Sequence, residues 1–62
     1  EILKMFIVEI TKKENKQFFG VSDGIEFKID TNKLTQKIKK GDVIEGKLMG
    51  GTIIAEIVKE VY

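Results

Sequence analysis

The side chains best suited to chemistry are lysines and two adjacent phenylalanines in the first half of the chain. Lys12, Lys13 and Lys16 lie in a run of six polar residues, and Phe18 and Phe19 follow almost directly. Lysine ammonium groups attract phosphate oxygens, and an exposed aromatic ring offers a surface on which a nucleobase stacks. These residue types at this spacing are typical of a site for single-stranded RNA or DNA.

The distribution of charge points to the same part of the chain. The net charge is only +1, and all eleven basic residues are lysines. Residues 11–40 carry eight lysines against four carboxylates, a net charge of +4, whereas residues 41–62 carry two lysines against four carboxylates. The candidate nucleic-acid contacts are Lys12, Lys13, Lys16, Phe18, Phe19, Lys28 and Lys33.

Catalysis is not indicated by the residue types present. The chain has no His and no Cys, so the commonest general base, thiol nucleophile and soft metal ligands are missing. Ser22 is the only serine, and the Asp23 beside it is better explained as a turn residue. Glu56 and Glu60 fall on the outward face of a predicted strand, where charge is ordinarily solvated. We therefore expect a non-enzymatic protein without metal or cofactor.

Alternation of apolar and polar residues predicts the strands that would position these side chains. Asp23-Gly24 and Gly50-Gly51 are signals of tight hairpin turns. Within 25–30, alternation places Ile25, Phe27 and Ile29 inward. Residues 11–16 are expected to form a basic loop. The predicted strands are residues 2–10, 17–22, 25–30, 43–49 and 52–61.

Residues 31–40 change period and predict a short helix between the third and fourth strands. Leu34 and Ile38 are four residues apart, which places them on one side of a helical turn. Gly41 suits the left-handed position that closes a helix. We expect a helix over residues 33–39 that covers an open end of a barrel. The alternative is an irregular loop held by the same two apolar side chains.

The two phenylalanines and the outer strands leave more apolar side chains than one small interior can hold. Phe18 and Phe19 point to opposite faces of a strand, so one ring is core and the other is free to stack. The first strand is apolar on both faces. The fifth places Ile54 and Val58 opposite a face formed by Ile53, Ala55, Ile57 and Val61. The alternative function is therefore a protein-interaction or self-association domain that uses Ile54, Val58 and the first strand.

The length and the apolar runs bound the organisation of the chain. Sixty-two residues form a single domain, residues 1–62, and the apolar fraction of 42% is typical of a folded globular protein rather than a disordered one. The longest purely apolar run, residues 5–8, is far shorter than the roughly 20 residues of a membrane helix. No signal-peptide pattern is present. We expect a cytoplasmic protein.

Five strands with an insert between the third and fourth are typical of an OB-fold barrel, and an SH3-like barrel is the alternative. Residues 38–44, 46–48 and 54–58 read Ile-Lys-Lys-Gly-Asp-Val-Ile, Gly-Lys-Leu and Ile-Ala-Glu-Ile-Val. This last third resembles the closing hairpin of TRAM-type OB barrels, which are RNA-binding appendages of tRNA-modifying enzymes. The resemblance implies an all-β barrel and an RNA ligand.

Overall fold

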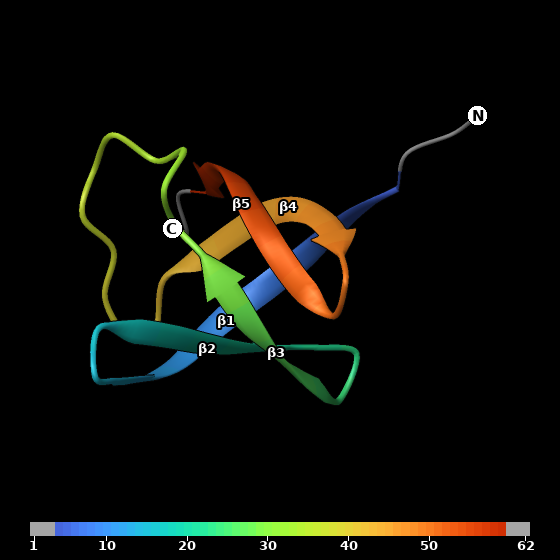
Figure 1. Cartoon of the computed structure of the whole chain (residues 1–62), viewed down its shortest axis with the longest axis horizontal. Helices are drawn as coiled ribbons and strands as arrows, with labels where there is room; N and C mark the ends of the chain where they lie inside the picture. Colours follow the sequence, from blue (N-terminus) through green and yellow to red (C-terminus); the bar gives the residue numbers. More distant parts are fainter. Residues whose placement is uncertain (1–3, 60–62) are drawn as a thin grey trace.

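Five strands account for most of residues 4–59, the part of the chain that the computed structural model describes (Figure 1). They close into a barrel in the order β1-β2-β3-β5-β4, and β4 pairs with β1. All neighbours are antiparallel except β3 and β5, which are parallel. The predicted all-β, five-stranded barrel is thus confirmed. The strands are β1 Met5–Glu14, β2 Gln17–Ser22, β3 Ile25–Asp30, β4 Val43–Met49 and β5 Thr52–Lys59.

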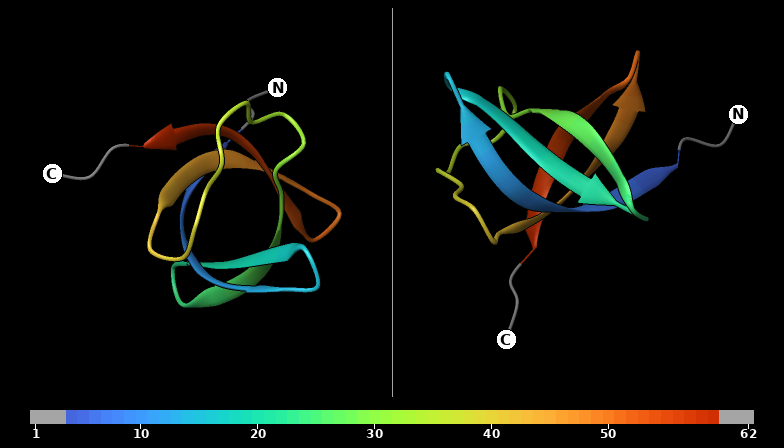
Figure 2. Two further views of the ribbon diagram at one scale, coloured as in Figure 1. Left: turned by 90° about the vertical axis from the view of Figure 1, so that its left-hand side faces the viewer. Right: turned by 90° about the horizontal axis from the view of Figure 1, so that it is seen from below.

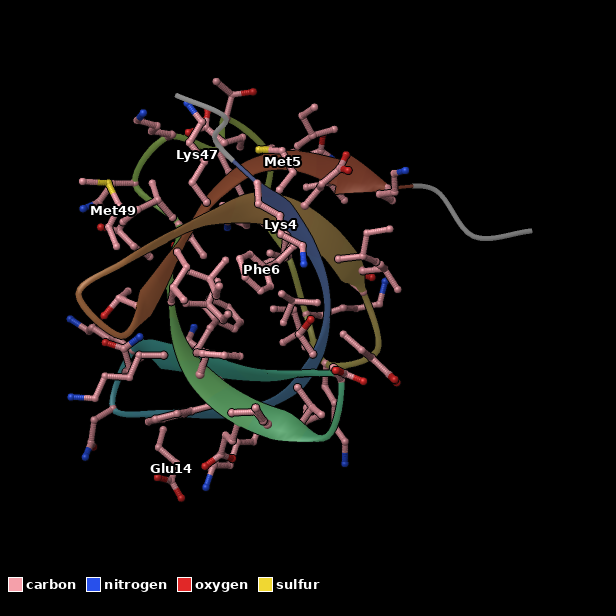
Figure 3. The ribbon with its side chains drawn as sticks, turned by 90° about the vertical axis from the view of Figure 1, so that its right-hand side faces the viewer. Lys4, Met5, Phe6, Glu14, Lys47 and Met49 are labelled. Atoms are coloured by element: carbon pink, nitrogen blue, oxygen red, sulfur yellow. The ribbon has the colours of Figure 1, made fainter. Side chains whose placement is uncertain are left out.

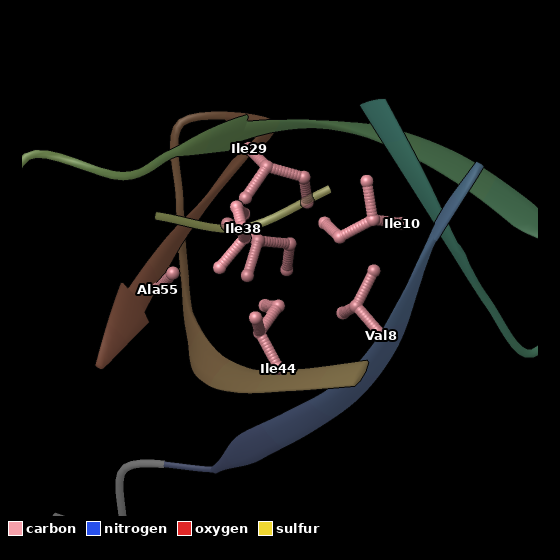
Figure 4. Packing of buried hydrophobic residues seen from close by; sticks show 7 residues of the cluster. Val8, Ile10, Ile29, Ile38, Ile44 and Ala55 are labelled. Carbon is pink, nitrogen blue, oxygen red and sulfur yellow. The ribbon is translucent and has the colours of Figure 1, made fainter. Parts of the chain in front are cut away.

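The strands surround one interior, which the end-on view in Figure 2 shows as a ring of ribbon. Most of the buried side chains are β-branched, and their alternation along each strand directs them inward (Figure 4). Ile25 lies on the same side of β3 as Ile29, but it is the first residue of the strand and is 57% exposed. The buried core consists of Val8, Ile10, Ile29, Ile38, Ile44, Ile53 and Ala55.

The two predicted hairpin turns are present. Asp23 and Gly24 have φ angles of 54° and 77°, and Gly50 and Gly51 have φ angles of 58° and 83°. Positive φ at both central residues is the requirement of a type I′ turn, whose twist matches that of the flanking strands. These turns fix the β2–β3 and β4–β5 registers.

The prediction of a loop over residues 11–16 is wrong for most of these residues. β1 continues to Glu14, and a third two-residue turn, Asn15-Lys16 with φ angles of 49° and 68°, joins it to β2. A register shift between Ile10 and Lys12 lets β1 bend away from the core while it stays paired with β2. Residues 11–14 form a strand because they stay paired with β2. Their side chains can be polar because this end of the hairpin extends beyond the hydrophobic interior.

The predicted helix over residues 33–39 is absent, because residues 31–42 form turns and bends. The Asp30 carboxylate accepts a hydrogen bond from the backbone N–H of Asn32 at 2.9 Å. The Asp42 carboxylate accepts one from the backbone N–H of Lys39 at 2.9 Å. Such local bonds from side chain to backbone compete with helical hydrogen bonds. The alternative of an irregular loop with two apolar anchors is confirmed, since Ile38 is buried and Leu34 packs against the core.

The prediction of which β5 side chains point into the barrel is wrong beyond Ala55. The β4–β5 register shifts between Glu45 and Gly46, so that Ile57 opposes Glu45 while Ala55 opposes Gly46. The extra residue reverses the alternation. Ile57 is therefore 52% exposed, whereas Val58 packs against the core. Val61, predicted on the same face as Ile57, lies outside the described residues.

Candidate nucleic-acid interface

One row of side chains crosses the outer face of the sheet formed by β1, β2, β3 and β5. Lys12 on β1 is paired with Phe19 on β2, Phe19 with Lys28 on β3, and Lys28 with Thr52 on β5. Paired residues point to the same face of a sheet, so the four side chains lie side by side. We call Lys12, Phe19, Lys28 and Thr52 the basic–aromatic row. It brings together three of the predicted contacts and adds Thr52.

The Phe19 ring is half-buried on this outer face, and Lys12 lies over it. The Lys12 Nζ is 5.0 Å from the ring centroid and 3.7 Å from a carboxylate oxygen of Glu26. A cation–π contact at an exposed site contributes about 0.5–1 kcal/mol, and an exposed ion pair contributes about as little. The Lys12 side chain is therefore held only loosely over the ring, and a ligand can displace it at low cost.

Two shallow hollows flank the row, one on each side of Lys28 and Thr52. A hollow of about 350 Å³ lies between Phe19 and the β4–β5 turn at Gly50-Gly51. A second, of about 240 Å³, reaches Lys16 in the β1–β2 turn. The right-hand view of Figure 2 shows these two turns projecting on either side of β3. The row thus lies on the floor of a face bordered by two hairpin turns, one of which carries a further lysine.

Phe18, the neighbour of Phe19, belongs to a different part of the molecule. It packs against the hydrophobic core, and the Lys13 Nζ is 5.1 Å from its ring centroid. Together with Leu34 and Ile38 it lines a hollow of about 380 Å³ where the 31–42 loop covers the barrel end. The sequence left open which ring is free to stack, and the structure places Phe19 on the open face.

Lys33 also lies apart from the basic–aromatic row. Its Nζ bonds a Glu56 carboxylate oxygen of β5 at 3.2 Å. The predicted set therefore divides in three: Lys12, Lys16, Phe19 and Lys28 share one face, Lys13 and Phe18 lie at the barrel end, and Lys33 contacts β5. Thr52 escaped prediction because the parallel pairing of β3 with β5 joins segments far apart in the sequence and leaves no local signal.

Two nearby polar side chains, Gln17 and Ser22, are engaged in the fold. The Gln17 amide donates to the carbonyl oxygens of Phe18 and Ile29, at 3.0 Å and 2.9 Å. The Ser22 hydroxyl is buried and donates to the Ile7 carbonyl at 2.9 Å. Within residues 4–59, no group of three or more His, Cys, Asp or Glu is placed to hold a metal ion.

No protein-family model matches the chain, and no curated protein or solved structure is significantly similar to it. The resemblance of the last third to TRAM-type barrels therefore stays a prediction. Within the described part of the chain, no helix is long and apolar enough to cross a membrane.

Proposed function

We propose that this chain is a non-catalytic binding module for single-stranded nucleic acid, with RNA as the first ligand to test. The observation that carries the proposal is the basic–aromatic row: one half-buried aromatic ring on the outer face with a lysine on each side of it. The barrel order is compatible with an OB-like barrel. OB barrels bind oligonucleotides on the face of strands two and three and on the loops that here are the β1–β2 and β4–β5 turns.

Each residue of the face has a defined role in this proposal. A base stacks on Phe19 after Lys12 leaves the ring, and Lys12, Lys16 and Lys28 bind the flanking phosphates. The lysines attract the backbone by charge and release its counterions, which favours binding at low salt. Phosphate contacts also replace the exposed Lys12–Glu26 ion pair, whose loss costs little.

The same geometry favours single strands over duplexes and predicts little sequence preference. The face of a base is accessible to Phe19 only when the base is unstacked from its neighbours. Base edges are read mainly by arginines and free amides; the chain has no arginine, the Gln17 amide is bound to the backbone, and Asn32 in the hollow beside Lys28 is the amide left for such a contact. Stacking and phosphate contacts alone tolerate every base.

Fluorescence anisotropy of a labelled mixed-sequence RNA, titrated at several salt concentrations, tests the proposal. We expect saturable binding whose logarithmic salt dependence has a slope of about −2, as three phosphate contacts to a single strand predict. An RNA duplex of equal length should bind more weakly. Absence of binding in low salt at high protein concentration would reject the proposal.

Two triple variants of equal net charge show whether binding belongs to this face. Replacing Lys12, Lys16 and Lys28 by Gln should abolish binding. Replacing the exposed lysines Lys39, Lys40 and Lys59, which lie outside the face, should leave most of it. Equal losses in the two variants would mean that only net charge matters.

A further inference from the structure

A second face of the barrel, formed by β1, β4 and β5, carries exposed apolar side chains. Ile7 of β1 and Ile57 of β5 are 56% and 52% exposed. They flank Glu45 of β4, because Ile7 pairs with Glu45 and Glu45 with Ile57. Burial of such side chains by a partner is favourable in proportion to the apolar area removed from water.

The adjacent row on this face has the same layout with the opposite charge. Met5 pairs with Lys47, and Lys47 with Ile54. Figure 3 shows Met5 and Lys47 on the outer side of the barrel, whereas Phe6 points into its opening. Each row thus has an apolar residue at both ends and a charge in the middle. The self-association face consists of Met5, Ile7, Glu45, Lys47, Ile54 and Ile57.

This layout is complementary to itself under one two-fold rotation. An axis in the plane of the face, perpendicular to β4 at Gly46, exchanges the two rows between copies. Ile7 then meets Met5 of the second copy, and Ile57 meets Ile54 of the second copy. Such reciprocal contacts define an isologous interface.

The same rotation brings opposite charges together. Glu45 of each copy faces Lys47 of the other, while the alternative axis, parallel to β4, would set Glu45 against Glu45. Lys47 has no carboxylate within ion-pair distance among the described residues, and Glu45 makes only a 3.8 Å contact to Lys59. Both charges are therefore available for contacts between copies.

We propose that two copies of this chain associate through the self-association face, with their β4 strands antiparallel. A stable interface covers roughly 800 Å² on each partner, about a sixth of the 4778 Å² surface of the chain. The six residues of the self-association face would form the centre of an interface of that size. Phe19 and Lys28 lie on β2 and β3, which are not neighbours of β4, and Lys12 and Thr52 lie outside the two paired rows of the self-association face, so the dimer leaves both basic–aromatic rows accessible. The inference does not depend on the proposed function.

Sedimentation equilibrium over a wide range of protein concentration tests the dimer by charge reversal. Wild type should dimerise, and Glu45→Lys or Lys47→Glu alone should weaken dimerisation by about tenfold or more, because each places like charges opposite one another twice. The double reversal should restore the dimer. An equimolar mixture of the two single variants should form a heterodimer.

A second measurement keeps the test independent of the variants' folding. On dilution of the wild type, the NMR methyl signals of Ile7 and Ile57 should shift, while the ring signals of Phe19 stay fixed. A monomer up to about 1 mM, an affinity limit near −4 kcal/mol, would overturn the inference. Single reversals that leave dimerisation unchanged in folded protein, or a double reversal that fails to restore it, would overturn it as well.

Discussion

Phe18 and Phe19 are adjacent in sequence and have opposite roles in the structure. Phe19→Ala should weaken RNA binding by about 1–3 kcal/mol, roughly five- to 160-fold in affinity, because it removes the stacking surface. Phe18→Ala should instead lower the free energy of unfolding by about 2 kcal/mol, since the ring packs against the core. Anisotropy titrations and urea unfolding of both variants measure the two effects. Equal effects of both substitutions on binding would contradict the assignment of Phe19 to the site.

Lys28 is the lysine at the centre of the basic–aromatic row, and its charge should be visible in the salt dependence of binding. Lys28→Gln is expected to reduce the slope of log affinity against log salt by about 0.7. The matched change Lys59→Gln removes a lysine that contacts Glu45 on the other side of the barrel, and it should leave the slope unchanged. The same slope change in both variants would show that Lys28 makes no specific phosphate contact.

At the scale of an element, the β1–β2 turn combines a structural cost with a binding role. Lys16 has a φ angle of 68°, a conformation that glycine adopts without strain. Lys16→Gly should raise the free energy of unfolding by about 0.5–1 kcal/mol and at the same time weaken RNA binding. Urea unfolding and anisotropy on one preparation measure both quantities. A variant that gains stability without losing affinity would exclude Lys16 from the site.

The close approach of the β4 and β5 backbones depends on Gly46. A Cβ at this position would collide with the carbonyl oxygen of Ile54 on the neighbouring strand. Gly46→Ala should therefore lower the free energy of unfolding by about 3 kcal/mol, the upper end of overpacking costs. Gly24→Ala, where a Cβ meets open space but φ is 77°, should cost only about 1 kcal/mol. Urea unfolding ranks the two, and the reverse order would contradict the close approach.

Local signals explain which elements were predictable. β2, β3 and β4 have the predicted bounds because alternation and glycine turns are properties of neighbouring residues. The part of β1 at residues 11–14 was not predicted because its side chains are polar. The reversed orientation of Ile57 and Val58 was not predicted because the bulge arises from pairing with β4. Of the site, the residue types could be predicted, but the row from Lys12 through Phe19 to Thr52 depends on register between distant strands.

At the scale of the whole molecule, barrel closure gives the chain two different outer faces. Among the five described strands closure leaves no free sheet edge, so a chain without cysteine keeps these strands paired by the barrel itself. The basic–aromatic row is centred on β2 and β3, and the face of β1, β4 and β5 is apolar around Glu45 and Lys47. Because β4 lies away from β2 and β3 in the strand order, binding on one face does not require the other.

An NMR titration of the labelled protein with a short single-stranded RNA locates the ligand residue by residue and shows whether nucleic acid binds at the basic–aromatic row. We expect shifts concentrated at Lys12, Lys16, Phe19, Lys28 and Thr52, with the amides of β4 unchanged. An absence of shifts, or shifts centred on Ile7 and Ile57 instead, would contradict this expectation.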